Sequence, residues 1–286
     1  MTAVPLGIPR RAVEFALDGE PVRAPEGSTV LDVCRAAGKD VPALCAGGSL
    51  APRGTCRLCV VEVEGAATLV PACSHRAESG LEVRTDSERV RHSRRIVLEL
   101  LASSADLSTT PGAAEWIEEY GASPDRFGPD AARAAEPPRV DNDLYVRDRG
   151  KCVLCRRCVD VCGDEGRSTF AVAVSGRGLG ARIAVEHDGP LTASACVYCG
   201  DCVDVCPTGA LSSRSEFDMR AAGTWDEGSQ TRTGTVCAHC GAGCGVTLHV
   251  QDNEIVKVTA LPDGSGAHGS LCSKGRFGYQ LVQNRD

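Results

Sequence analysis

The sequence CVLCRRCVDVC at residues 152–162 recurs as CVYCGDCVDVC at residues 196–206, and these two runs decide the architecture of the chain. Each run has the spacing Cys-x2-Cys-x2-Cys-x3-Cys, and Pro207 follows the second run. Three thiolates at such short intervals wrap three corners of a cubane cluster, whereas a tetrahedral zinc site uses two separated cysteine pairs. The spacing therefore predicts two [4Fe-4S] clusters and leaves zinc as a weak alternative.

The fourth cysteine of each run is expected to serve the other cluster, as in two-cluster bacterial ferredoxins. We expect this ferredoxin-type domain to cover residues 142–213. The predicted ligand sets are Cys152, Cys155, Cys158 and Cys206 for one cluster, and Cys196, Cys199, Cys202 and Cys162 for the other.

The 286-residue chain has few large core side chains, with 5 Phe, 2 Trp, 4 Tyr and 2 Met, but it has 17 Cys and 32 Gly. Its length allows two or three domains, and the shortage of bulky residues indicates that metal ligation helps to hold them together. The net charge of −7 argues against a general binder of nucleic acid or anionic membranes, since both depend on a cationic surface. Proteins are the favoured partners.

The amino terminus lacks the apolar core of a signal peptide, and the chain has no apolar run long enough to span a membrane. The pair Arg10 and Arg11 is followed by Glu14, Asp18 and Glu20, where an exported protein needs an apolar stretch. We therefore expect a cytoplasmic location. Because cytosolic thiols stay reduced, the cysteines are interpreted as metal ligands and not as disulfides.

The first module, over residues 10–100, has the order of elements of a β-grasp. A hairpin is predicted around Asp18 and Gly19, and a helix should follow, with Ser28 as its cap and Gly38 as its stop. Three further strand candidates are CVVEVEG, TLVPAC and LEVRT, and SERVRHSRRIVLELLASS reads as a following helix.

A [2Fe-2S] cluster is predicted in this first module. Its cysteines keep the close central pair and the distant fourth ligand of plant-type ferredoxins, with a longer first interval. Gly47, Gly48 and Gly54 let the loop bring backbone N–H groups close to the sulfurs. The predicted ligands are Cys45, Cys56, Cys59 and Cys73.

The third module, over residues 233–286, is predicted to be small and mainly β, with a hairpin around residues 251–253. Its four cysteines leave zinc and [4Fe-4S] both open on spacing alone, and His239 is expected to face solvent. Four ligand sets then leave over only Cys34, which we interpret as a small buried core residue. The ligands of this last set are Cys237, Cys240, Cys244 and Cys272.

Two segments between the modules are predicted to be linkers. Residues 101–141 are rich in Ala, Pro and Gly, with one short helix around Trp116, and residues 214–232 are polar and without a pattern. The glycine-rich SGRGLG at residues 175–180 is interpreted as a tight turn, because it lacks the strand-turn-helix context of a nucleotide loop.

This order of motifs resembles the amino-terminal part of the catalytic α subunit of NAD-linked, molybdenum-dependent formate dehydrogenases. The resemblance is most specific over CVYCGDCVDVCPTGAL and over TVCAHCGAGCGVTLHV with LCSKGRFGYQ. It implies an α+β, multidomain fold whose last module is a [4Fe-4S] domain of the Mo/W-bisMGD type. The largest peripheral subunit of complex I and the iron-only hydrogenases look similar in the first module, but the later motifs disfavour both.

Two departures from that family bear on activity. Residues 92–128 contain His92 but no Cys, so the family's cluster with one histidine and three cysteine ligands is absent. The family also continues into pterin-binding domains, whereas this sequence stops at Asp286. By resemblance, Lys274 sits between the last cluster and the pterin. We expect no molybdopterin bound by this chain alone and no formate oxidation by it.

The sequence therefore predicts an electron-transfer polypeptide with one [2Fe-2S] and three [4Fe-4S] clusters and no catalytic residues of its own. Its expected partners are a molybdopterin-binding catalytic polypeptide, an NAD(H)-flavin diaphorase-type subunit, or both. A freestanding ferredoxin-like adaptor for another oxidoreductase is the alternative, and a zinc-stapled interaction protein is a remote one.

Overall fold

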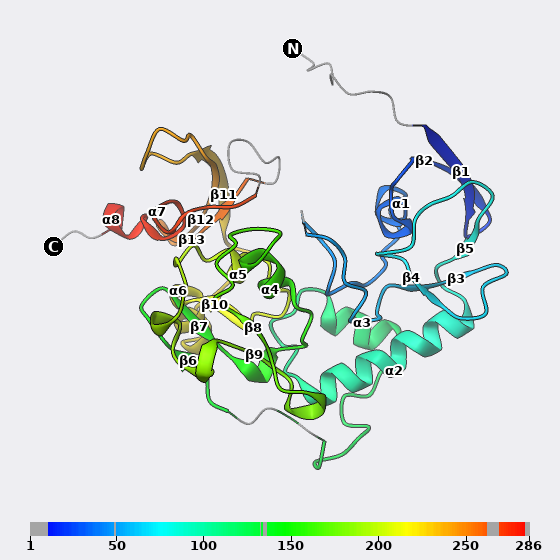
Figure 1. The fold of residues 1–286 in the computed structure, drawn as a ribbon, viewed down its shortest axis with the longest axis horizontal. Coiled ribbons are helices and arrows are strands. Elements are labelled where there is room, and N and C mark those ends of the chain that lie inside the picture. Colours follow the sequence, from blue (N-terminus) through cyan, green and yellow to red (C-terminus); the bar gives the residue numbers. More distant parts are fainter. Residues whose placement is uncertain (1–10, 49, 132, 134–135, 262–268, 284–286) are drawn as a thin grey trace.

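The computed structural model describes residues 11–48, 50–131, 133, 136–261 and 269–283. Arg10 and the last residues of the third expected domain lie outside these ranges. Figure 1 shows the β-grasp in blue and cyan at one end, the ferredoxin-type part in green to yellow, and the third module in orange and red beyond it. Helices α2 (Glu88–Ser104) and α3 (Ala113–Glu119) follow the β-grasp and lie between it and the ferredoxin-type part.

The first module is the predicted β-grasp, a five-stranded sheet in the order β2-β1-β5-β3-β4. The turn between its first two strands is made by Asp18 and Gly19, whose φ angles of 51° and 84° suit a tight hairpin. Strand β1 pairs with β2 antiparallel and with β5 parallel. The strands are β1 Ala12–Leu17, β2 Glu20–Pro25, β3 Val60–Val63, β4 Val70–Pro71 and β5 Glu82–Arg84.

Helix α1 (Val30–Ala36) begins one residue later than predicted. Thr29 and not Ser28 is its N-cap, because Thr29 and Asp32 form a reciprocal capping box. Gly38 follows the helix with φ of 70° and ends it as predicted. Cys34 is fully buried in the core of this module, which confirms its interpretation as a core residue.

The ferredoxin-type domain has two short helices that face each other, α4 (Arg157–Cys162) and α5 (Asp201–Asp204). The SGRGLG segment runs from the end of strand β8 (Ala173–Ser175) through the turn before β9 (Arg182–Ala184), which confirms a tight turn. The remaining strands form a sheet in the order β10-β7-β6, with bounds β6 Arg139–Val140, β7 Tyr145–Arg147 and β10 Leu211–Ser213. Four single turns of 3₁₀ helix are Arg149–Lys151, Gly178–Gly180, Glu186–Asp188 and Leu191–Ala193.

The third module is mainly β as predicted, and its hairpin turns at Asp252 and Asn253, both with positive φ. A third strand, which the sequence analysis missed, completes the sheet in the order β11-β12-β13. The elements are β11 Thr231–Val236, β12 Gly245–Gln251, β13 Glu254–Ala260, α7 Ser273–Phe277 and α8 Gln280–Gln283.

The prediction of a patternless linker over residues 214–232 is wrong for its first part, which is helix α6 (Arg214–Ala221). Ser213 caps this helix by accepting a hydrogen bond from the N–H of Glu216. Its packing side carries ionic contacts instead of an apolar stripe, since Glu216 binds both Arg220 and Lys257 of β13. The sequence of this helix therefore shows no apolar periodicity by which it could be predicted.

No helix in the described ranges is long and apolar enough to cross a membrane. The apolar cores are small, and each of the larger ones includes cysteines: the β-grasp core contains Cys34, Cys59 and Cys73 among its buried members. The scarcity of bulky residues in the sequence is thus reflected in cores that cysteine side chains help to fill.

We expect Cys34→Ser to lower the free energy of unfolding by about 1 to 3 kcal/mol, because a hydroxyl would enter an apolar core. Burial already raises the pKa of the Cys34 thiol to about 11, in keeping with an inert side chain. Denaturant unfolding measures the effect, with Cys34→Ala as the control that adds no polar group. Loss of the [2Fe-2S] electron paramagnetic resonance (EPR) signal in Cys34→Ser would contradict the assignment.

Candidate metal centres

The four thiols predicted for the [2Fe-2S] cluster lie together in the β-grasp, and all four are buried. The pKa of Cys45 is lowered because the thiols of Cys56 and Cys73 donate hydrogen bonds to it. The pKa of Cys59 is lowered to about 7, chiefly by a hydrogen bond from Cys73. The thiols therefore form two neighbouring pairs, Cys45 with Cys56 and Cys59 with Cys73, joined by the contact between Cys45 and Cys73.

The two ferredoxin runs have the same local backbone. Leu154 and Tyr198 occupy equivalent positions in the two repeats, with φ of 52° and 56°. Arg156 and Gly200 are also equivalent, with φ of 69° and 75°. A bulky residue at positive φ costs roughly 1–2 kcal/mol, so its recurrence at matched positions indicates a shared local requirement.

The shared requirement is that backbone N–H groups in and after these left-handed turns donate hydrogen bonds to sulfur. The N–H of Leu154 donates to Cys152 in the first run, and the N–H of Tyr198 donates to the Sγ of Cys196 at 3.4 Å in the second. The next thiol in each run is served in the same way, Cys155 by Arg157 N–H and Cys199 by Asp201 N–H. Such concave rows of N–H groups stabilise anions, including thiolate-bound clusters.

The last cysteine of the second run lies among the first three of the first run. Burial and the neighbouring charges of Cys206 and Cys152 together raise the pKa of Cys155 to about 11. Burial also raises the pKa of Cys158, with the charges of Cys206 and Cys155 again contributing. Cys206 thus lies close to Cys155 and Cys158, two members of the ligand set predicted for it from the sequence.

The reciprocal arrangement holds for the second set. The pKa of Cys202 is raised by burial and then by the charges of Cys199, Cys196 and Cys162. Helices α4 and α5 carry Cys162 and Cys202 and pack on each other, which brings the two runs together. The ligand sets themselves stay predictions. In the described part of the chain, no three Cys, His, Asp or Glu side chains close around one metal ion.

Three hydroxyl groups that sequence reasoning missed also reach thiols. The hydroxyl of Tyr145 lies 3.0 Å from the Sγ of Cys196, and that of Thr169 lies 3.2 Å from Cys162. Thr208 contacts Cys206 at 3.8 Å from the CPT sequence that ends the second run. Only Thr208 carried a sequence signal, because it is two residues from a predicted ligand. Thiol-only donor sets surrounded by hydrogen-bond donors fit iron-sulfur clusters.

The third cysteine set is more open than the others. Cys240 and Cys272 are exposed, and the N–H of Cys237 donates to the carbonyl of Cys244 at 2.8 Å. Cys272 is the N-cap of α7, where a Cβ on Gly275 would lie 3.5 Å from the Sγ of Cys237. The start of α7 therefore lies beside the first cysteine of the set.

Two other residues singled out in this module lie near that set. His239 is exposed, as predicted, although its ring lies against the backbone at Gly278. Lys274 is exposed on α7, two residues after Cys272. Its position near the pterin stays a prediction.

The [2Fe-2S] loop packs directly on the ferredoxin-type domain. Cys45, Cys56 and Cys155 belong to one apolar cluster. Arg53 makes a bidentate ion pair with Asp160 of α4, at 2.9 and 2.7 Å. The first two thiol sets along the chain are therefore adjacent across a domain boundary.

Asp201 joins the ferredoxin-type domain to the third module. Its carboxylate is 3% exposed and accepts hydrogen bonds from Arg276 at 2.7 Å, Arg167 at 2.7 Å and the N–H of Leu271 at 3.3 Å. Arg276 also donates to the carbonyl of Cys199 at 2.7 Å. Since Leu271 precedes Cys272, this one carboxylate links the second ferredoxin run to the last cysteine set.

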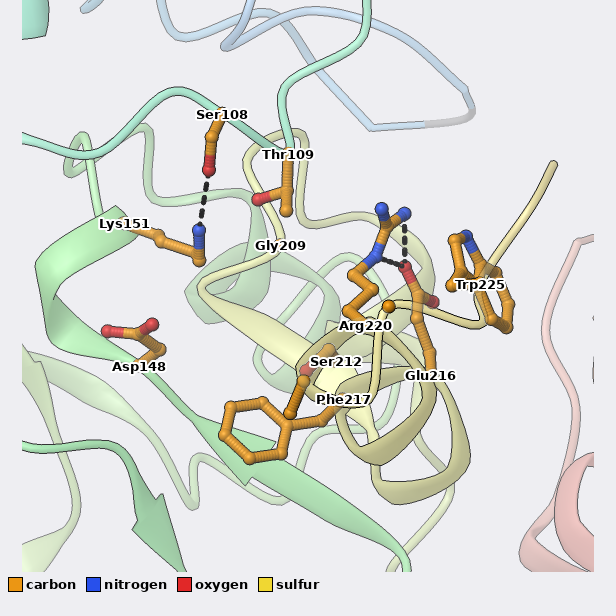
Figure 2. A pocket seen from close by; sticks show the side chains of 12 residues that line it. Ser108, Thr109, Asp148, Lys151, Gly209, Ser212, Glu216, Phe217, Arg220 and Trp225 are labelled. Atoms are coloured by element: carbon orange, nitrogen blue, oxygen red, sulfur yellow. Dashed lines mark hydrogen bonds and ion pairs between the residues drawn. The ribbon is translucent and has the colours of Figure 1, made fainter.

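A pocket of about 420 Å³ lies outside the thiol sets, between the segment at Ser108 and helix α6. Figure 2 shows Lys151 and Arg220 in its wall, with Trp225 beside the arginine. Both cations have acid partners, Lys151 with Asp106 and Arg220 with Glu216. The pocket therefore offers no unpaired cation among the described residues that line it.

Comparisons with known proteins agree with this division into three. Residues 10–88 match the family described as "2Fe-2S iron-sulfur cluster binding domain", residues 151–210 match "4Fe-4S dicluster domain", and residues 230–284 match "Molybdopterin oxidoreductase Fe4S4 domain". The chain is 31% identical to an NADH-quinone oxidoreductase subunit of Rhizobium meliloti, over 96% of this chain and 32% of the relative. It is 25% identical to the putative formate dehydrogenase YrhE of Bacillus subtilis, over 96% of this chain and 32% of that protein.

A solved structure is also similar. The crystal structure of an NAD+-reducing [NiFe]-hydrogenase matches with a TM-score of 0.62 and 29% identity, over 71% of this chain and 87% of that chain. The chain spans about a third of the length of the curated relatives it matches. The NADH-quinone oxidoreductase relative matches almost the whole chain and not the first module alone, so the sequence-based preference against the complex I group is too narrow.

These matches confirm the predicted fold class and the resemblance to the amino-terminal iron-sulfur region of molybdopterin oxidoreductases. The chain is an iron-sulfur electron-transfer polypeptide, similar to the iron-sulfur modules of complex I, hydrogenase and formate dehydrogenase subunits.

We expect Asp201→Asn to loosen the third module from the ferredoxin-type domain, since it removes a buried charge that serves Arg276 and Arg167. Breaking a buried pair costs about 3–5 kcal/mol. Hydrogen exchange should show faster exchange at residues 271–277 and no change in the β-grasp. Asp218→Asn is the control, because its exposed pair with Arg214 contributes less than about 1 kcal/mol. Unchanged protection at 271–277 would contradict the linking role.

Proposed function

We propose that this chain conducts electrons through one [2Fe-2S] and three [4Fe-4S] clusters. Its iron-sulfur domains are similar to those of the amino-terminal region of molybdopterin oxidoreductases. The [2Fe-2S] ligands are Cys45, Cys56, Cys59 and Cys73. The two ferredoxin-type clusters take Cys152, Cys155, Cys158 and Cys206, and Cys196, Cys199, Cys202 and Cys162. The last cluster takes Cys237, Cys240, Cys244 and Cys272.

One observation carries this proposal: successive thiol sets lie next to one another, joined by shared packing and by hydrogen bonds. Cys45 and Cys155 share an apolar cluster. Cys158 and Cys202 lie close enough for the charge of one to raise the pKa of the other. Asp201 then connects the second run to the residue before Cys272. When bound, the clusters supply one-electron chemistry, while the chain fixes their spacing, excludes water and donates hydrogen bonds to their thiolates.

The proposed partners are inferred from the relatives, which include subunits of an NADH-quinone oxidoreductase and of an NADP-reducing hydrogenase, and from the similar NAD+-reducing [NiFe]-hydrogenase. We propose a molybdopterin-binding polypeptide beside the third module, with Lys274 between the last cluster and the pterin. We propose a diaphorase-type subunit beside the first module, at the opposite end of the series of clusters. This subunit would exchange electrons with NAD(H).

A freestanding adaptor is the second candidate, and the anchoring of α7 favours it. Arg276 and Phe277 are buried against the ferredoxin-type domain, and a Cβ on Gly200 would clash with the side chain of Arg276. The third module is thus held by this chain's own residues.

Anaerobic reconstitution should give about 14 iron atoms per chain with matching sulfide, the content of one [2Fe-2S] and three [4Fe-4S] clusters. Elemental analysis and Mössbauer spectroscopy measure it. Zinc in place of iron would overturn the proposal.

Paired substitutions test the exchanged ligands. Cys206→Ser combined with Cys152→Ser should damage one [4Fe-4S] cluster, because both residues are assigned to the same set. Cys206→Ser combined with Cys196→Ser should damage two. Mössbauer quantitation distinguishes these outcomes, and the reverse pattern would show that each run binds its own cluster.

Brief exposure to air should remove roughly one [4Fe-4S] equivalent first, since two cysteines of the third set are exposed and loosely held sites open most readily. Cys237→Ser should leave the spectra of the other three clusters unchanged. Simultaneous decay of all three [4Fe-4S] clusters would instead favour the freestanding adaptor.

A further inference from the structure

Arg94 of α2 is a buried cation without an acid partner. Its exposed fraction is 1%, and the other two buried arginines in the described ranges both form ion pairs. Arg147 pairs with Asp141 at 2.5 Å, and Arg276 pairs with Asp201 at 2.7 Å. Arg94 forms no such pair with any described residue, so its charge is unlike those of the other two.

The hydrogen bonds of Arg94 are satisfied by neutral groups alone. Its Nε donates to the carbonyl of Leu58 at 3.1 Å, its Nη2 to the carbonyl of Val60 at 3.0 Å, and its Nη1 to the hydroxyl of Tyr120 at 2.7 Å. These contacts fix the guanidinium but do not neutralise it. A buried, unpaired charge is costly, so such a group is expected to have a counter-charge nearby.

The two carbonyls place the guanidinium beside a proposed cluster ligand. Leu58 and Val60 flank Cys59, which is fully buried and is one of the proposed [2Fe-2S] ligands. The guanidinium is therefore bonded to the backbone on both sides of this cysteine, where a turn leads into β3. A [2Fe-2S] cluster with four thiolates is anionic in both oxidation states and gains one negative charge on reduction.

Building on the proposed cluster site, we propose that Arg94 is the counter-ion of the [2Fe-2S] cluster and sets its reduction potential. Its fixed charge favours the more negative, reduced cluster and so raises the potential. The ring of Tyr120 holds the guanidinium in place, with the Cζ of Arg94 5.5 Å from the ring centroid. Arg94 is thus a fixed positive charge at the first module, where electrons enter or leave the chain through the [2Fe-2S] cluster.

The test is an EPR-monitored redox titration of the full chain with reconstituted clusters. Arg94→Met and Arg94→Gln should lower the equilibrium constant for [2Fe-2S] reduction by tenfold or more, equivalent to about 59 mV for a one-electron couple. Arg94→Lys, which keeps the charge, should stay near the wild-type potential.

Arg91→Met is the matched control. Arg91 lies on the same helix, with its Cζ 5.2 Å from the centroid of the same Tyr120 ring, but it is half-exposed and pairs with Asp86. Its removal should leave the [2Fe-2S] potential unchanged, although it takes away the same formal charge.

The outcomes are distinguishable. Absence of a [2Fe-2S] signal in the wild-type chain would refute the proposed function itself. A wild-type signal with unchanged potentials in the neutral Arg94 variants would overturn only the counter-ion proposal. If the neutral variants fail to assemble the cluster, assembly in Arg94→Lys supports a requirement for charge, whereas failure of all three shows that the shape of the side chain matters and overturns the proposal.

Discussion

The structure depends on one constraint: anionic sulfur must be held inside a chain that has little apolar bulk with which to enclose it. Backbone N–H groups meet this need in both ferredoxin runs, where Leu154 and Tyr198 adopt the same left-handed conformation. The chain accepts local backbone strain because each left-handed turn directs N–H groups at thiols. The apolar cores around these loops can then be small, since metal ligation supplies part of the stability that a larger core would give.

Partly and fully buried ionic contacts hold the modules in order where apolar contacts are scarce. Arg53 and Asp160 join the first module to the second, and Asp201 with Arg276 joins the second to the third. Such contacts are directional, so they fix the orientation of neighbouring thiol sets as well as their separation. Electron transfer needs this kind of fixed spacing, and a flexible linker could not supply it.

The sequence predicted what depends on local spacing and turn chemistry. The Asp18-Gly19 hairpin and the order of elements along the β-grasp are of this kind. It did not predict α6, whose packing side is ionic, or β11, an exposed edge strand with little apolar pattern. Asp201, Arg276 and Arg94 were also missed, because a buried charge is recognisable only when its distant partners are known.

The segment after the first module contains no cysteine, and its side chains pack beside the first two thiol sets instead of binding a cluster. Trp116 and Tyr120 of this segment pack in the apolar cluster that contains Cys45, Cys56 and Cys155. Tyr120 also accepts a hydrogen bond from Arg94, which in turn is bonded to the carbonyls on both sides of Cys59. Apolar and aromatic side chains therefore fill the region beside the first two thiol sets and keep water from it. Because Cys45 and Cys155 pack in one apolar cluster, the β-grasp meets the ferredoxin-type domain directly, whereas His92 is exposed on α2.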